Sequence, residues 1–275
     1  MAQGSFGMIT AWNDFTGFPG GIVTVPDASG EYLGGGWGLI GVNEGVILHT
    51  VDEPGGILDI TTDVGDDDNN AIYAGVFQPN DGGMEMEVRF KIPDSVAATR
   101  AAVFVGFTET LNKDTPVMPF ERATATNTFN GTGGIIGIGF DSDSTILEFF
   151  AVAGDVAVGL TSTDAQGNAT DATGVQLVTG TETTAVPGGT ILTADRWYIV
   201  RVEVDPNGVG RVYLGDYDGG DSLTKTLRLV LTNTAPLGAG DNFHAVAMIE
   251  NRSGANERLE VDYAWAKGGR DWASN

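Results

Sequence analysis

Residues 84–92 alternate apolar and charged side chains, and this pattern constrains the fold more than any other feature of the chain. The apolar positions are Met84, Met86, Val88, Phe90 and Ile92, and the charged positions between them are Glu85, Glu87, Arg89 and Lys91. A period of two residues indicates a β-strand with one buried face and one face in water. Residues 101–108 are apolar almost throughout, as is typical of a strand covered on both faces.

Further short alternating segments recur between clusters of Gly, Asp, Asn and Pro. They are residues 57–62, 71–77, 135–140, 145–152, 197–205, 209–214, 227–231, 243–250 and 259–267. Pro206, Asn207 and Gly208 separate two of these segments and supply the positive φ angles of a hairpin turn. Many short strands joined by polar turns predict an all-β, two-sheet antiparallel sandwich.

Two regions depart from the alternating pattern. We predict an N-terminal arm over residues 1–20, rich in Gly and aromatic residues, and a sandwich domain over residues 21–270 that carries a long loop or extra hairpin at about 161–191. An ordered arm is usually held by a partner. The predicted partner-binding residues of the arm and loops are Phe6, Trp12, Phe15, Phe18, Trp37 and Trp272.

Charge and residue content exclude several classes of partner. The formal net charge is −23, from 37 acidic and 14 basic residues, which disfavours binding to nucleic acid or to an anionic membrane. The chain has no cysteine, so it can form neither disulfides nor thiolate metal sites. We also expect no secretory signal peptide, because the first residues contain no basic segment followed by an apolar one.

Catalytic patterns are absent from the sequence. Retaining glycosidases place two carboxylates about 5 Å apart, but each candidate pair, such as Glu85 and Glu87, lacks a third carboxylate on its strand and reads as the solvent face of that strand. The only histidines, His49 and His244, are not spaced to bind a metal, and no nucleophile elbow is present. We therefore predict that the protein is not an enzyme.

The acidic segment 63–69 allows two interpretations. Its predicted calcium ligands are Asp63, Asp66, Asp67, Asp68 and Asn69, because calcium binds six to eight hard oxygen ligands. Alternatively, the segment is an Asx-rich turn that joins two paired antiparallel strands, since Asp and Asn cap their own backbone and tolerate left-handed φ. Apart from this calcium ion, no cofactor is expected.

Glycan binding needs exposed aromatic rings with polar groups beside them. The tryptophans Trp12, Trp37, Trp197, Trp265 and Trp272 are the candidates. Since Trp197 and Trp265 lie within predicted strands, we expect them in the core.

Three segments resemble a known superfamily. RWYIVRVEVDPNGVGRVYLGD (196–216), LEVDYAWAKGG (259–269) and GGILDITTDVGDDDNNAIYAG (55–75) resemble strands of concanavalin A-like and laminin-G-like jelly rolls, a superfamily that contains lectins and glucanases. The run GGMEMEVRFKI followed by VFVGFTET resembles virion proteins of tailed bacteriophages, which serve as capsid decoration (cement) subunits or parts of fibres. The resemblance implies a jelly-roll sandwich.

From this resemblance we predict a non-enzymatic structural virion protein that binds and stabilises the outer surface of a phage head. The alternative is a glycan-binding, lectin-like module of a phage fibre or receptor-binding protein. The implied partners are the major capsid protein and neighbouring copies of the chain in a homo-oligomer, with glycans as a further possibility and with neither nucleic acid nor membrane. The expected location is the capsid surface of the virion, after synthesis in the host cytoplasm.

Overall fold

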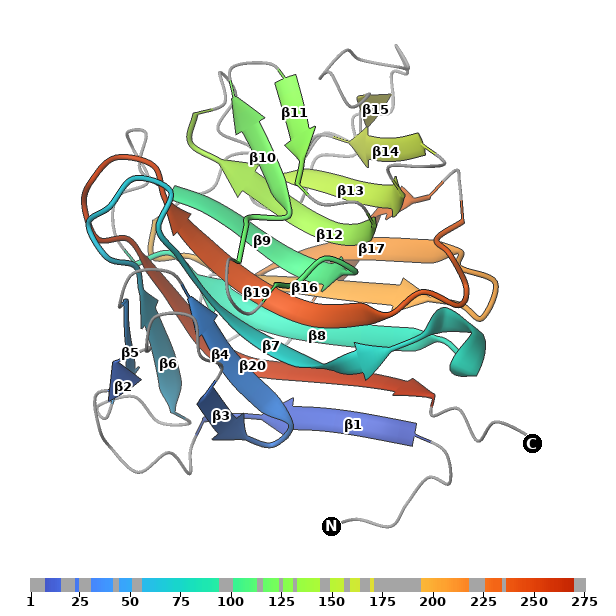
Figure 1. The fold of residues 1–275 in the computed structure, drawn as a ribbon, viewed down its shortest axis with the longest axis horizontal. Coiled ribbons are helices and arrows are strands. Elements are labelled where there is room, and N and C mark those ends of the chain that lie inside the picture. Colours follow the sequence, from blue (N-terminus) through green and yellow to red (C-terminus); the bar gives the residue numbers. More distant parts are fainter. Residues whose placement is uncertain are drawn as a thin grey trace.

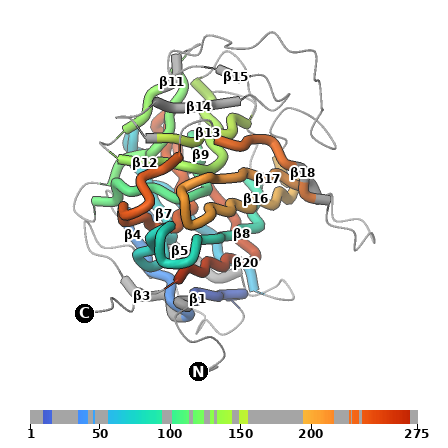
Figure 2. The backbone as a smooth tube through the Cα atoms, turned by 90° about the vertical axis from the view of Figure 1, so that its right-hand side faces the viewer, coloured from blue at the N-terminus to red at the C-terminus, as the bar shows by residue number. Residues whose placement is uncertain are grey.

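The fold is that of a computed structural model, which describes residues 8–15, 23–24, 31–41, 45–50, 56–93, 101–112, 116–123, 126–130, 133–143, 149–155, 159–163, 169–170, 194–217, 226–233 and 236–269. Within these residues the chain forms two large antiparallel sheets and one small hairpin. Figure 1 shows the sheets from one face, and Figure 2, turned by 90°, shows β12, β9 and β7 in one layer and β17, β16 and β8 in the other. The predicted all-β, two-sheet jelly-roll sandwich is confirmed.

We call the first layer sheet A. Its strands run in the order β18-β17-β16-β8-β20-β6-β5-β2, and β1 also pairs with β20. They are β1 (Met8–Asn13), β2 (Val23–Thr24), β5 (Val46–Thr50), β6 (Ile57–Thr61), β8 (Met84–Lys91), β16 (Trp197–Val204), β17 (Gly210–Tyr217), β18 (Thr226–Thr232) and β20 (Arg258–Gly269). The short 3₁₀ helix η1 (Pro79–Asp81) precedes β8.

The second layer, sheet B, has the strand order β15-β14-β13-β12-β9-β19-β7-β4-β3. Its strands are β3 (Glu31–Gly34), β4 (Trp37–Gly41), β7 (Asn69–Phe77), β9 (Ala101–Thr108), β12 (Gly134–Asp141), β13 (Phe150–Asp155), β14 (Gly159–Thr163), β15 (Ala169–Thr170) and β19 (Phe243–Asn251). The separate hairpin consists of β10 (Phe120–Ala123) and β11 (Thr126–Phe129).

The main core fills the space between the sheets. The apolar face of β8 contributes Met84, Met86, Val88 and Phe90, each at most 1% exposed, as the alternating pattern predicts. Burial of such apolar side chains is the dominant favourable term in folding. The charged residues of β8 consequently lie on the outer face of sheet A.

A second core covers the outer face of sheet B. The hairpin β10–β11 packs there through Phe120, whose ring centroid lies 6.0 Å from that of Phe150. Gly139 allows this contact, because a Cβ atom at this position would lie 2.0 Å from Cδ1 of Phe120. Sheet B is thus buried on both faces beneath the hairpin, which explains why β9 is apolar at nearly every position. Sheet A has no such second layer among the described residues, so within this part of the chain its outer face is the open face.

The turn and arm predictions have different outcomes. The hairpin through Asn207 is confirmed, with Gly208 at φ +80° between β16 and β17. The acidic segment 63–69 does not join paired strands: β6 pairs in sheet A and β7 in sheet B, so the segment is a corner between the layers. Residues 8–13, assigned to the arm, form β1 alongside β20. Most of the loop predicted at 161–191 lies outside the described residues.

Among the described residues, no helix has the length and hydropathy that a membrane-spanning helix requires.

Candidate functional site

The open outer face of sheet A carries two rows of side chains that run across the strands. In the first, which we call the aromatic row, six residues are cross-strand neighbours on six adjacent strands. The row is Leu229 (β18), Tyr213 (β17), Arg201 (β16), Glu87 (β8), Trp265 (β20) and Trp12 (β1). Five strand spacings of roughly 4.8 Å make the row about 24 Å long. Its two end residues, Leu229 and Trp12, are 53% and 52% exposed.

The ring of Trp12 is stacked on a second aromatic ring of this face. It stacks on Tyr263 with ring centroids 5.9 Å apart and an interplanar angle of 17°. The Tyr263 hydroxyl donates a hydrogen bond to Oε1 of Glu87 at 2.6 Å. Burial, followed by this hydrogen bond and the negative charge of Glu87, raises the pKa of Tyr263, so its hydroxyl keeps its proton. The stack therefore presents one broad, fixed aromatic surface.

The second row, which we call the charged row, lies next to the first on the same strands. It consists of Thr232 (β18), Arg211 (β17), Glu203 (β16), Glu85 (β8), Lys267 (β20) and Thr10 (β1). Lys267 binds Glu85 with a nitrogen–oxygen distance of 3.0 Å. The row contains donors and acceptors side by side, and both kinds of group can bind hydroxyl groups.

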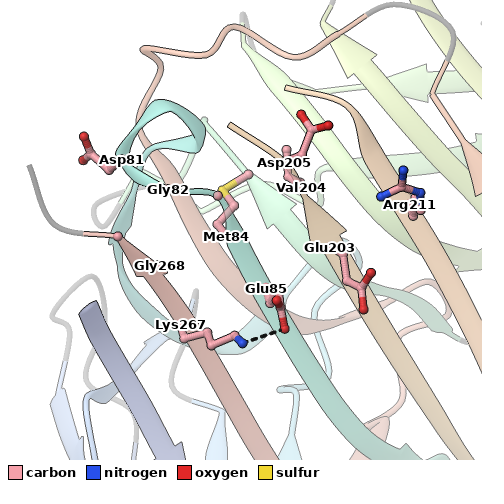
Figure 3. Close-up of a pocket in the computed structure, with 12 residues that line it drawn as sticks. Asp81, Gly82, Met84, Glu85, Glu203, Val204, Asp205, Arg211, Lys267 and Gly268 are labelled. Atoms are coloured by element: carbon pink, nitrogen blue, oxygen red, sulfur yellow. Dashed lines mark ion pairs between the residues drawn. The ribbon is translucent and has the colours of Figure 1, made fainter. Parts of the chain in front are cut away.

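A pocket of about 450 Å³ opens along the charged row (Figure 3). One side is formed by Arg211, Glu203, Glu85 and Lys267, and the opposite side by Asp81, Gly82, Gly83, Asp205, Gly268 and Gly269. Gly83 has φ +86°, and a Cβ atom there would lie 2.8 Å from the Val204 carbonyl oxygen, so glycine is required in this wall. Together, the aromatic row, the charged row and this pocket form what we call the binding face.

The paired carboxylates of this face are not arranged for glycoside hydrolysis. Glu85 and Glu203 are direct neighbours on β8 and β16. Nη2 of Arg201 contacts both carboxylates, at 3.4 Å from Glu85 and 2.7 Å from Glu203. A cation therefore occupies the space between the carboxylates, where a retaining or inverting glycosidase would hold the scissile bond.

A second polar cluster lies on the sheet B side, beneath the hairpin. Arg252, 8% exposed, contacts four carboxylates: Glu250 (2.8 Å), Asp67 (2.8 Å), Asp141 (3.2 Å) and Glu121 (3.6 Å). Burial raises the pKa of Glu250 to about 7, although Arg252 opposes the shift. Burial alone would lower the pKa of Arg252, but the carboxylates, Glu250 foremost, raise it. This cluster joins the corner 63–69, the hairpin, β12 and β19, so its role is structural.

Of the six predicted partner-binding residues, two are buried, one is exposed and three lie outside the described residues. Trp37 and Phe15 are fully buried in the main core, so neither ring is accessible to a partner in this fold. Trp12 is exposed as predicted, but on a strand of sheet A. Phe6, Phe18 and Trp272 lie outside the described residues.

Trp197 and Trp265 were expected in the core, and that prediction is wrong. Both lie on the outer face of sheet A, where Arg89 covers the ring of Trp197 and Lys267 lies 5.7 Å from the ring centroid of Trp265. The small neighbours Ala264 and Ala266 face inward instead. Strand membership alone does not predict burial, because alternate residues face opposite sides.

The predicted calcium ligands do not converge on one point. Oδ1 of Asp67 accepts a hydrogen bond from Arg252 at 2.8 Å. Asn69 donates through Nδ2 to the Pro116 carbonyl oxygen at 2.9 Å and to Glu250 at 3.3 Å. No group of three or more acidic, histidine or cysteine side chains able to hold a metal occurs among the described residues. The five residues, including Asp63, Asp66 and Asp68, therefore do not fit a shared calcium site.

The sequence analysis missed Tyr213, Arg201, Tyr263 and Leu229 as candidate binding residues. Their outward positions follow from the alternation within each strand. Their neighbourhood does not, because it depends on the strand order β18-β17-β16-β8-β20-β1.

Comparisons with known proteins bear on the fold alone. Neither protein-family models nor curated protein sequences match the chain. A similar solved structure is a protein of unknown function from Shewanella oneidensis MR-1, with a TM-score of 0.57 and 14% sequence identity over 97% of this chain and 88% of that one.

Two lectin-type structures resemble the chain more loosely. The carbohydrate recognition domain of Emp47p has a TM-score of 0.47 and 11% identity over 96% of this chain and 97% of that one. Arcelin-5, a lectin-like defence protein from Phaseolus vulgaris, has a TM-score of 0.44 and 11% identity over 96% of this chain and all of that one. At these scores neither structure supports an inference about function.

Proposed function

We propose that the protein binds carbohydrate on the outer face of sheet A and does not transform it. The observation that carries this proposal is the aromatic row, in register across six strands beside a charged row and a pocket of about 450 Å³. Binding sites for small polar ligands combine apolar or aromatic surface with a few placed polar groups, and this face has both.

The chemistry of the binding face suits sugars. An aromatic ring offers a flat apolar surface with a negative quadrupole face, against which the C–H side of a sugar ring packs. The Trp12–Tyr263 stack supplies such a surface, and Trp265 lies directly beside Trp12 in the row. Carboxylates of the charged row accept hydrogen bonds from sugar hydroxyls, while Arg201, Arg211 and Lys267 donate them.

Binding without catalysis follows from the ion pairs. Because Arg201 bridges Glu85 and Glu203, the face holds its carboxylates as hydrogen-bond acceptors rather than as an acid and a nucleophile. Hydrolysis of a bound oligosaccharide over a long incubation would contradict this part of the proposal.

Titration with oligosaccharides tests the proposal. Tryptophan fluorescence and calorimetry should both report saturable binding, and Trp12→Ala should weaken it by about fivefold or more, as expected when an anchor residue worth over roughly 1 kcal/mol is truncated. Val64→Ala is the control, because Val64 is 54% exposed but lies in the corner between the sheets. If no glycan of a broad panel binds, or if both variants behave alike, the proposal is wrong.

The predicted role on a phage capsid stays a prediction, as does its location on the virion. The described residues carry no observation that bears on a capsid partner. Carbohydrate binding agrees with the alternative drawn from the sequence, a glycan-binding module.

A further inference from the structure

We propose that the binding face takes an internal segment of a long, electrically neutral polysaccharide, laid across the strands of sheet A. This inference rests on the proposed carbohydrate binding and adds the class of ligand and its orientation. It follows from three features: the balance of charge on the face, its open ends and its length.

The outer face of sheet A is close to electrical balance, although the chain is not. Among described side chains on the outward positions of the sheet A strands, the bases are Arg89, Lys91, Arg201, Arg211, Arg258 and Lys267, and the acids are Asp59, Glu85, Glu87, Glu203, Glu260 and Asp262. These are six of each sign, and Asp81 and Asp205 of the pocket bring the acids to eight against six bases, in a protein with 37 acidic and 14 basic residues. Acidic chains would be repelled by the net charge of −23 without a basic surface to bind, and cationic chains would meet only a small acidic excess on this face.

The pairing within the face strengthens this argument. Glu85 forms an ion pair with Lys267, and Glu203 forms one with Arg201. Glu87 accepts a hydrogen bond from the Tyr263 hydroxyl. A charged ligand group at these three carboxylates would have to displace one of these contacts. A hydroxyl group can donate to a carboxylate and accept from a guanidinium without breaking either, because each has further hydrogen-bonding capacity. Neutral polyhydroxylated chains therefore match the face best.

Within the described part of the chain, both ends of the charged row are open. The row ends in the small, exposed residues Thr10 on β1 and Thr232 on β18, and no described side chain closes either end. The wall that contains Gly82 and Asp205 runs along the side of the row, as the close-up of the pocket shows (Figure 3). A groove with a side wall and open ends admits a chain that continues in both directions.

The length of the face exceeds one sugar ring several times. Trp12 and Leu229 are separated by five strand spacings, about 24 Å. They are also among the few exposed large apolar side chains of the described residues. Only a ligand that spans the whole row can contact both, and contacts distributed along a chain add in affinity.

Calorimetric titration with ladders of neutral oligosaccharides tests the proposal. The probes are β-1,4-linked glucose, mannose and xylose series and a β-1,3-linked glucose series, from the monosaccharide to the octasaccharide. For at least one series the affinity should rise about tenfold or more from disaccharide to hexasaccharide. Chemical reduction of the chain end should change it less than about twofold, as should an increase from about 50 to about 500 mM NaCl, because no net charge is exchanged. Alginate and chitosan, as anionic and cationic polymers, should bind more weakly than the neutral series.

Two variants at opposite ends of the row give the sharper readout. Trp12→Ala and Leu229→Ala should each weaken hexasaccharide binding by about threefold or more, with Val64→Ala as the control. A disaccharide should respond to at most one of them. Affinity that is independent of chain length, or lost on reduction of the chain end, would overturn the internal-segment inference while leaving carbohydrate binding intact. Binding of alginate or chitosan alone would overturn the neutral class.

Failure of the underlying function has a different signature. In that case no probe of any charge or length gives saturable heat. If the protein instead forms a concentration-dependent dimer that Trp12→Ala abolishes, the face is an interface between copies of the chain, and both proposals are wrong. Size-exclusion chromatography with light scattering measures this directly.

Discussion

Replacing Arg252 by methionine should destabilise the protein strongly, because its guanidinium contacts the buried carboxylates of Glu250 and Asp141. Each of these side chains is 2% exposed, and they lie 2.8 and 3.2 Å from Arg252. Breaking a buried ion pair by removing one partner costs about 3–5 kcal/mol, since the remaining charge has neither water nor a counter-ion. We expect a loss in this range in the free energy of unfolding at pH 8.

The loss should depend on pH. Without Arg252, the buried carboxylates can escape the penalty by binding a proton, so the variant should recover part of its stability as the pH falls from 8 to 5. Urea unfolding followed by circular dichroism measures the free energy. Urea is preferable to a guanidinium salt, because guanidinium could occupy the space that Arg252 vacates.

Arg211→Met is the matched control, because Arg211 is exposed and forms no ion pair among the described residues. It should change the stability by less than about 0.5 kcal/mol. If Arg252→Met costs less than about 1 kcal/mol at pH 8, or if its loss is the same at pH 5, the carboxylates do not depend on Arg252, and the structural role assigned to this cluster is wrong.

Three further perturbations follow from the structure. Burial raises the pKa of Glu250 from 4.5 to about 7, so the stability contributed by its protonated form is fully present below pH 4.5 and lost as the pH rises through 7. Glu250→Gln removes this titration, and the variant should therefore gain about 2 kcal/mol relative to the wild type between pH 5 and pH 8. Parallel stability curves for the two proteins would contradict this. Gly139→Ala should cost about 1–3 kcal/mol by pressing a methyl group into the ring of Phe120, whereas Gly240→Ala, whose nearest neighbouring atom would be 3.7 Å away, should cost little; equal losses would contradict the packing argument. Asp205→Ala should cost about 1–2 kcal/mol, because Oδ1 of Asp205 accepts the backbone N–H groups of Asn207 (2.8 Å) and Val209 (3.0 Å), and Asp205→Asn, which keeps an acceptor, should recover much of this loss in the same urea assay.

The strands themselves were largely predictable. The alternation in residues 84–92 correctly placed Met86, Val88 and Phe90 in the core and Glu85 on the outer face, whereas Glu87, predicted to face water, points to that side but is only 3% exposed. The hairpin at Asn207 was predictable because a glycine at positive φ after Asn is a local signal. Such features depend on the residue's own conformation and its nearest neighbours in the chain.

The binding face could not be predicted in the same way. Trp12 appeared to belong to a terminal arm, because nothing near it in the sequence indicates that residues 8–13 pair with residues 264–269. Trp265 appeared to belong to the core, because an apolar residue in a strand is buried only if it falls on the inward side. The corner at 63–69 resembled a hairpin because the two flanking strands look alike, although each joins a different sheet.

The sequence alone determined that the chain forms short antiparallel strands and which side of β8 is buried. The tertiary structure decided which strands are neighbours and in what register. That choice depends on how two sheets pack around one core and on long-range contacts such as the pairing of β1 with β20. The free energy of such contacts cannot be inferred from the residues near each strand in the sequence. Only this register brings Trp12, Tyr213, Arg201 and Trp265 into one row, and the proposed function rests on that row.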